Sequence, residues 1–282
     1  MCLAEQIDCS YPQQDGEGGF SQKMDSFPSI PRDDTVLSKI TQLYNLEGNS
    51  IDQIPGDVCG PFDTLHELRL NDNEISEIDE DAFEGCQDLK VLTLRKNFLS
   101  EIPTETFQDM PKLEILVLDE NEIMMIGADS FNNLPSLRWI YLRNNKIRQI
   151  NEMAFNRLPR LDFMHLEENY LSHLQVNWMD HLRADQKKHA VKSKAERGEV
   201  KLFLDENPVR CDCNLREFYN KAKKEYGEMI DMEEIVCDSP AQFRDKMLDE
   251  LTDADLKKCS DEPDLILVYD PVSGILGSDR AS

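Results

Sequence analysis

The sequence lacks any long hydrophobic run. Its longest uninterrupted apolar stretch covers only residues 265–269, whereas a membrane-spanning helix needs roughly 20 apolar residues. The first residues contain neither a basic start nor the apolar core of a signal peptide, and no Asn-x-Ser/Thr sequon for N-linked glycosylation occurs anywhere. Basic residues are scarce as well, with 31 Lys and Arg against 56 Asp and Glu and a formal net charge of −25. Such a charge repels phosphate and anionic lipid, which argues against a nucleic-acid partner.

Motifs of catalysis are also missing. There is no Gly-rich phosphate loop, no H-E-x-x-H, no G-x-S-x-G and no acidic calcium loop. The five His are scattered along the chain. We therefore expect no enzymatic activity, no cofactor and no metal site, and we look for the function on a surface.

The eight cysteines gather mainly toward the two ends of the chain. This grouping predicts ends that are closed by disulfide bonds, and hence an oxidising compartment. The cysteines are Cys2, Cys9, Cys59, Cys86, Cys211, Cys213, Cys237 and Cys259.

An internal repeat dominates the middle of the chain. Six asparagines follow one another at intervals of 24 residues: Asn49, Asn73, Asn97, Asn121, Asn145 and Asn169. Around them the pattern L-x-x-L-x-L-x-x-N-x-[IL] recurs, with five full copies from LHELRLNDNEI to LDFMHLEENYL. A last copy ends in LFLDENP, with Asn207 in register after 14 extra residues. The chain from about 36 to 207 resembles the leucine-rich-repeat family.

The resemblance implies an α/β fold, a curved horseshoe-shaped solenoid with a parallel sheet on its concave face and disulfide-stapled caps. Within each copy the first, fourth and sixth positions point inward, and neighbouring strands lie about 4.8 Å apart. We expect the Asn amide to bond backbone groups that the turn leaves unpaired. Phe83, Phe107, Phe131 and Phe155 should fill the convex half of the core. Phe at this position with a 24-residue period resembles the subclass common in animal extracellular proteins.

We divide the chain into four parts. Residues 1–35 form an N-terminal cap, and residues 36–207 form about seven repeats with an insertion near 177–198. Residues 208–260 form a C-terminal cysteine-rich cap, and residues 261–282, with their Pro and Gly, form an extended tail.

The segment after the last repeat resembles the C-terminal flanking cap of extracellular leucine-rich-repeat proteins, because a C-x-C is followed by a helical stretch, a Cys shortly before a Pro, and a closing Cys. The resemblance implies the disulfides Cys211–Cys237 and Cys213–Cys259. A C-x-C can also bind zinc, but the sequence offers no second close Cys or His pair.

The N-terminal residues resemble the second half of the family's N-terminal cap, with Cys2 and Cys9 followed by an Ile-Pro at residues 30–31. We expect that the chain begins inside this cap, and that Cys2 and Cys9 then pair with each other; a simpler native cap with one disulfide is the alternative. Cys59 and Cys86 lie diagonally across two neighbouring repeats, so their Cα atoms are expected near the roughly 7 Å limit for a disulfide. A disulfide bond and two buried thiols are therefore equally open.

The stretch LRWIYLRNN at residues 137–145 carries two aromatics at strand positions that should face away from the core. In a solenoid strand, the third and fifth positions face the open concave side. The residues at these two positions in successive repeats form two columns across the sheet. The columns predict one contiguous binding patch with a polar rim that includes Arg95 and Arg143. The patch consists of Val91, Ile115, Val117, Trp139, Tyr141, Phe163 and His165. In the alternative, the rings merely stack on one another or are covered by the C-terminal tail.

The insertion is the second surface feature. Residues 181–201 contain seven Lys or Arg against three Asp or Glu, and their composition suggests a projecting helical arm. We expect either a solvated charged loop or a dock for an acidic protein or sulfated glycan, centred on Lys187, Lys188, Lys192 and Lys194.

These features together predict an extracellular protein-binding module, either secreted or the ectodomain of a receptor or adhesion protein. A non-catalytic subunit of a secreted enzyme complex and a structural extracellular-matrix protein are the alternatives. An array of this kind defines a scaffold, and the sequence names no ligand.

Overall fold

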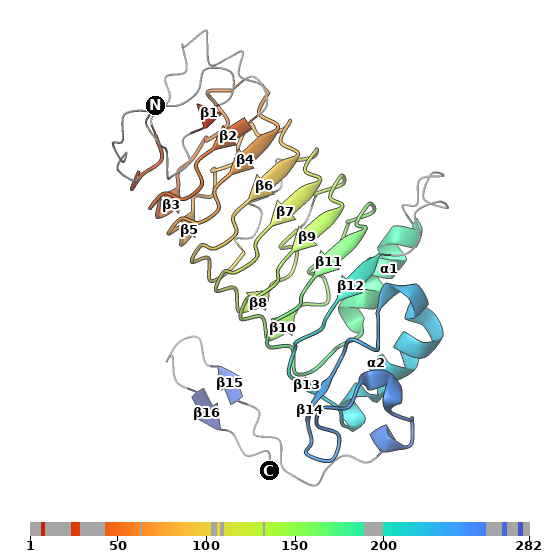
Figure 1. Cartoon of the computed structure of the whole chain (residues 1–282). Coiled ribbons are helices and arrows are strands. Elements are labelled where there is room, and N and C mark those ends of the chain that lie inside the picture. Colours follow the sequence, from red (N-terminus) through yellow and green to blue (C-terminus); the bar gives the residue numbers. More distant parts are fainter. Residues whose placement is uncertain are drawn as a thin grey trace.

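The computed structural model describes residues 7–8, 24–28, 43–62, 64–102, 106–107, 110–131, 133–188, 200–257, 267–269 and 276–278. One parallel sheet of eight strands runs along the molecule (Figure 1). Its strands, in spatial order, are β1 (Ile7–Asp8), β2 (Leu43–Asn45), β4 (Glu67–Arg69), β6 (Val91–Thr93), β7 (Ile115–Val117), β9 (Trp139–Tyr141), β11 (Phe163–His165) and β12 (Lys201–Phe203). From β2 onward each repeat supplies one strand, so the predicted solenoid with a parallel sheet is confirmed.

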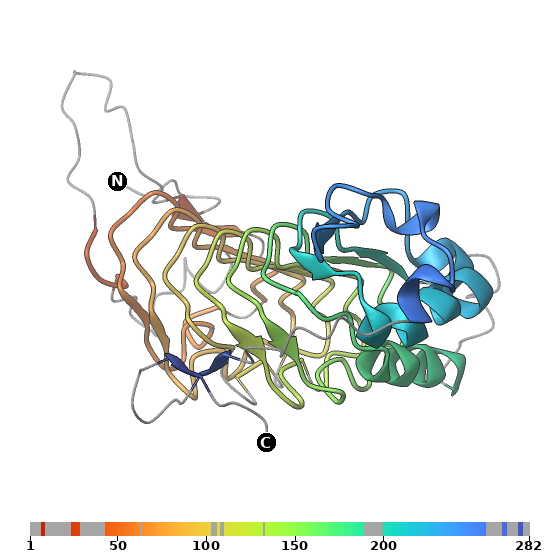
Figure 2. The ribbon, with the colours of Figure 1, turned by 90° about the horizontal axis from the view of Figure 1, so that it is seen from below.

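Short strands line the side opposite the sheet (Figure 2). They form two parallel pairs, β3 (Gln53–Ile54) with β5 (Glu77–Ile78), and β8 (Met125–Ile126) with β10 (Gln149–Ile150). Beyond the repeats lie β13 (Val209–Arg210), α2 (Arg216–Lys221) and β14 (Cys237–Ser239), and then the antiparallel hairpin of β15 (Leu267–Tyr269) and β16 (Leu276–Ser278). No helix in the described part of the chain is both long and apolar enough to span a membrane.

The hydrophobic core fills the space between the sheet and the short strands. Leu92, Leu116 and Ile140, the fourth positions of their copies, are completely buried. On the convex side the predicted phenylalanines form a buried row, in which Phe131 and Phe155 stack with ring centroids 5.5 Å apart. All four phenylalanines expected in the core are therefore found there.

The repeated asparagines form a buried ladder along the solenoid. Asn121 shows the pattern: its Nδ2 donates to Leu94 O at 2.9 Å and to Leu118 O at 3.0 Å, and its Oδ1 accepts from Leu99 N at 3.1 Å. One amide thus bonds backbone groups of two successive repeats. Asn207 makes the same bonds, although its partner Leu166 lies 41 residues before it. The ladder therefore continues across the insertion without a change of register.

The extra residues of the last repeat include helix α1 (Asn177–Lys188). Its first half is packed rather than projecting, because Trp178, Met179 and Leu182 are buried. The Trp178 ring meets Phe155 edge to face at 5.4 Å and so extends the phenylalanine row. The helix is also tied to the C-terminal cap, since Tyr226 Oη donates to Asp180 Oδ1 at 2.9 Å.

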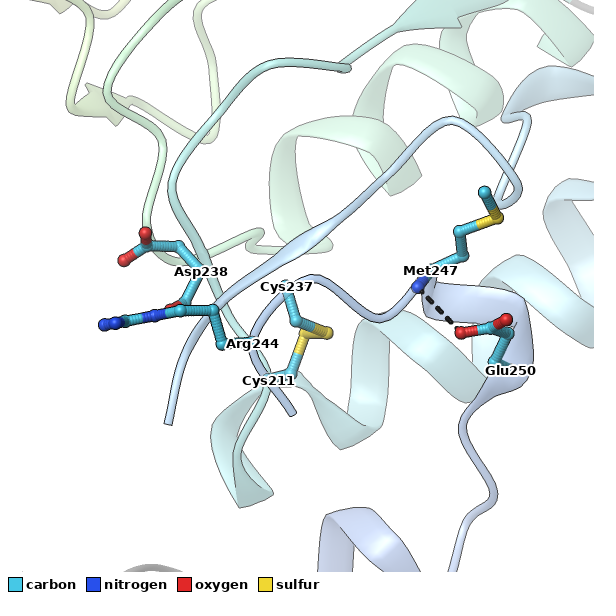
Figure 3. The surroundings of a disulfide bond; sticks show 6 residues. All are labelled: Cys211, Cys237, Asp238, Arg244, Met247 and Glu250. Atoms are coloured by element: carbon cyan, nitrogen blue, oxygen red, sulfur yellow. Dashed lines mark hydrogen bonds between the residues drawn. A yellow bond between two sulfur atoms is a disulfide. The ribbon is translucent and has the colours of Figure 1, made fainter. Parts of the chain in front are cut away.

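Two disulfide bonds join described cysteines. Cys211 and Cys237, with Cα atoms 5.6 Å apart, hold the start of the cap against β14 (Figure 3). Nearby, Met247 N donates to Glu250 Oε2 at 3.2 Å and closes the next turn. Cys59 and Cys86, for which the sequence left two states open, are bonded with Cα atoms 5.2 Å apart. Cys213 is disulfide-bonded too, while Cys2, Cys9 and Cys259 lie outside the described residues.

The ladder generates the first prediction. Asn121→Ala removes an amide that bonds Leu94 O, Leu118 O and Leu99 N, and each buried group left unpaired costs about 1–3 kcal/mol. We expect the free energy of unfolding, measured with urea, to be lower in this variant by about 3 kcal/mol or more. Asn151→Ala is the matched control, because Asn151 is exposed and its Oδ1 accepts only a local bond from Met153 N. Equal losses in both variants would contradict the role of the ladder.

The disulfides generate the second prediction. Peptide mapping of the oxidised protein should recover Cys59 linked to Cys86 and Cys211 linked to Cys237. The pairing implied by the family resemblance adds Cys213 linked to Cys259. Free thiols at these positions, or other partners, would contradict the prediction.

Candidate functional site

The strand register of the sheet gathers the predicted patch on one face. Trp139 pairs with Ile115 on one side and Phe163 on the other, and Tyr141 pairs with Val117 and His165. Val91 continues the first of these columns. All seven patch residues are half-buried, whereas the residues between them on the strands are buried in the core. The structure therefore places the whole predicted patch on the face of the sheet that points away from the core, here called the concave face.

Aromatic rings on the concave face stack across the strands. The His165 ring lies between Tyr141 and Phe203, with centroid distances of 4.7 and 4.4 Å and nearly parallel planes. Trp139 and Phe163 are also parallel, with centroids 6.5 Å apart. This stacking was one of the alternatives considered from the sequence, and it leaves every ring half-buried rather than buried. Phe203, which the predicted patch omits, extends the row by one strand.

An arginine that the sequence analysis missed also contacts the patch. The Arg138 guanidinium carbon lies 4.1 Å from the centre of the Trp139 ring, a cation–π arrangement. Its Nε donates to Asp162 Oδ2 at 2.7 Å, which fixes the side chain in place. The neighbouring letters R and W gave no sign of this contact, because it depends on an acidic residue one repeat later.

The predicted rim arginines lie at one end of the strands. Arg95 Nε donates to Glu120 Oε1 at 2.7 Å, and Arg143 Nε donates to Glu168 Oε1 at 2.8 Å. Both arginines are exposed, so these ion pairs contribute little to stability. They do fix the direction of both guanidinium groups, toward a glutamate of the next repeat.

Carboxylates also lie beside the stacked rings. Asp119 Oδ1 accepts from Arg143 N at 2.8 Å, and burial raises the pKa of this carboxyl to about 6. Glu167 Oε1 lies 2.8 Å from His165 Nδ1, while its Oε2 is buried and has no hydrogen-bond partner among the described residues. Burial, together with the charge of Glu167, also raises the pKa of Asp205. A negative region thus borders the aromatic row.

An open groove of about 520 Å³ lies between the turns that follow the repeat asparagines and the C-terminal cap. Its lining includes two exposed apolar side chains, Tyr170 and Val236. No sequence pattern pointed to this groove, because it forms between segments that are far apart in the chain.

The predicted basic arm is only partly described. Lys187 and Lys188 fall in the last turn of α1, where side chains are not described, and Lys192 and Lys194 lie outside the described residues. Docking of an anionic partner there stays a prediction. Within the described residues, no group of three or more His, Cys, Asp or Glu is placed to hold a metal ion.

Comparison with known proteins agrees with this architecture. The sequence model described as "Leucine rich repeat" matches residues 63–123 and 111–171. No curated protein matches in sequence. Solved structures do match. Human 5T4, also called trophoblast glycoprotein, is 23% identical with a TM-score of 0.61, over 83% of this chain and 84% of that one.

Two further structures are longer than this chain. A chain of the Drosophila Toll–Spatzle complex is 20% identical with a TM-score of 0.60, over 76% of this chain and 30% of that one. A chain of the mouse RP105/MD-1 complex is 19% identical with a TM-score of 0.53, over 80% of this chain and 39% of that one. These likenesses show the fold, and the matching sequence model agrees with the repeats and the asparagine ladder. The chain contains leucine-rich repeats, which the sequence model identifies over residues 63–171.

Proposed function

We propose that this chain is an extracellular protein-binding module, secreted or part of a cell-surface ectodomain, and that its partner binds the concave face around Trp139, Tyr141 and Phe163. The observation that carries the proposal is the row of half-buried aromatic and aliphatic side chains on the face of the sheet turned away from the core. Contiguous apolar patches on a protein surface mark interaction sites, and aromatic residues dominate binding hot spots.

The geometry of the patch supports this use. Stacking between strands holds the rings in fixed positions, so a partner does not have to order them on binding. Figures 1 and 2 show the hairpin of β15 and β16 apart from the eight-stranded sheet. The part of the tail that the structure describes therefore leaves the concave face open to a partner.

Disulfide bonds support the extracellular part of the proposal, since they persist in oxidising compartments. The similar structures agree with it as well, because one is named a glycoprotein and another is described in a glycosylated form. Two of them come from protein–protein complexes, which supports the binding of a protein rather than a small molecule.

Truncation of the central aromatic residue tests the proposal. Trp139→Ala should weaken binding of a protein ligand by at least about 30-fold, because removing a central anchor costs about 2 kcal/mol or more. The melting temperature should fall by only a few degrees, since the ring is half-buried and loses one stacked pair worth about 0.5–1.5 kcal/mol and the contact with Arg138 worth about 0.5–1 kcal/mol. A panel of purified extracellular proteins would supply the ligand, and surface plasmon resonance would give both affinities.

Phe98→Ala provides the matched control, because Phe98 is an aromatic residue with 53% exposure that lies outside the strands of the sheet. This variant should bind like the unchanged protein. If Trp139→Ala instead lowers the melting temperature by many degrees and leaves binding intact, the aromatic row belongs to the fold and the proposal is wrong.

A further inference from the structure

The carboxylates beside the aromatic row occupy equivalent positions of their repeats, directly after the sixth-position leucine. This column reads Glu47, Asn71, Arg95, Asp119, Arg143, Glu167 and Asp205. The two arginines in it could neutralise their acidic neighbours, but each guanidinium instead pairs with the glutamate one position further along the next repeat. Asp119 and Glu167 are therefore left without an arginine or lysine ion pair among the described residues.

Asn71 shows that the fold does not need a charge at this position. Asn71 Oδ1 accepts a hydrogen bond from Arg95 N at 2.8 Å. Two repeats later, Asp119 Oδ1 accepts the corresponding bond from Arg143 N, also at 2.8 Å. A neutral amide thus makes the same backbone contact that the carboxylate makes. Because burying a charge without a counter-ion is unfavourable, Asp119 costs stability that an asparagine would not.

Glu167 adds a second unsatisfied group two repeats away. Its side chain is only 12% exposed, and its Oε2 is buried without a hydrogen-bond partner within the described chain. Tyr141 lies on the strand between these two repeats, and its phenol experiences the charges of both Asp119 and Glu167. The rings of Tyr141 and His165 stack there, half-exposed. Carboxylate oxygens beside partly exposed aromatic rings are the surroundings that bind a Lys or Arg side chain through charge-assisted hydrogen bonds.

We infer that the protein partner of the concave face inserts a lysine or arginine side chain beside Tyr141, where the carboxylates of Asp119 and Glu167 receive it. The inference rests on the proposed function and adds the chemistry of the ligand. Charge complementarity supports it, because the chain carries a net charge of −25 and, among the described residues, only the His165 ring lies against these carboxylates, with no arginine or lysine ion pair. The inserted cation would lie beside the Glu167 carboxylate and would neutralise Asp119.

The stability of a neutral variant tests the cost of the charge. Burial raises the pKa of Asp119 from 3.8 to about 6, and the charge of Glu167 raises it further. The hydrogen bond from the Arg143 backbone and the charges of His165 and Arg95 lower it, but they do not offset the burial. The folded state therefore holds this proton more tightly than the unfolded state, and the benefit of protonation is lost as the pH rises through 6. Asp119→Asn should melt above the unchanged protein at pH 7.5, and the difference should shrink toward pH 4. A lower melting temperature of the variant at pH 7.5 would show that the charge stabilises the fold, and would overturn the inference.

Direct binding of a guanidinium group is the decisive experiment. The probe is N-acetyl-arginine amide, and N-acetyl-norleucine amide controls for its aliphatic part. With the unchanged protein at pH 7.5, the arginine probe should shift the Tyr141 and His165 ring signals saturably in NMR spectra, and the norleucine probe should not. Asp119→Asn and Glu167→Gln should each weaken this binding at least about fivefold, because each removes a charge-assisted contact.

Glu101→Gln is the matched control, since it removes the same charge from an exposed position outside the concave face. It should leave the affinity for the arginine probe unchanged. Absence of saturable shifts, or equal weakening by all three variants, would overturn the inference. A protein ligand whose affinity needs Trp139 but is unchanged in Asp119→Asn would also overturn it, while the proposed function would stand.

Discussion

The hydrogen bonds of the buried asparagines are the interaction on which the rest of this structure depends. A strand of three residues followed by a turn leaves backbone groups unpaired inside the molecule, where each would be costly. The amide of Asn121 bonds carbonyl oxygens of its own repeat and of the preceding one. It thereby closes the turn and fixes the distance to the neighbouring repeat. The same bonds at Asn207 hold the last repeat in register although extra residues precede it.

Fixed register has a direct consequence for the surface. Equivalent residues of successive repeats become neighbours on adjacent strands, so the chain forms columns of side chains on the concave face. Aromatic rings in such columns lie close enough to stack, as His165 does between Tyr141 and Phe203. The buried hydrogen bonds of the asparagines therefore hold the apolar side chains of the concave face in a fixed arrangement.

Charge is distributed by the same geometry. Arg95 and Arg143 reach forward to a glutamate of the next repeat, and each pair links two turns of the solenoid at the surface. This choice of partner leaves Asp119 and Glu167 next to the aromatic row with no arginine or lysine ion pair among the described residues, and the Glu167 carboxylate contacts only the His165 ring. Burial raises the pKa of Asp119, and a carboxyl group perturbed in this way often marks a functional position, because selection for stability alone would favour a neutral residue such as the asparagine at position 71.

The sequence by itself determined the class of fold, the register of the repeats and the common face of the seven predicted patch residues, although it omitted Phe203. It did so because a strict 24-residue period fixes which residues are buried and which are neighbours across strands. Contacts that depend on side-chain direction could not be read in this way. The Cys59–Cys86 bond required Cα atoms 5.2 Å apart, where spacing alone placed them near the limit for a disulfide. The position of Arg138 over Trp139 and the burial of Glu167 Oε2 also needed the folded chain. Tertiary structure decided these features because a repeat fixes Cα positions only approximately outside the strands, while packing against other residues decides where a long side chain ends and which charged group it contacts.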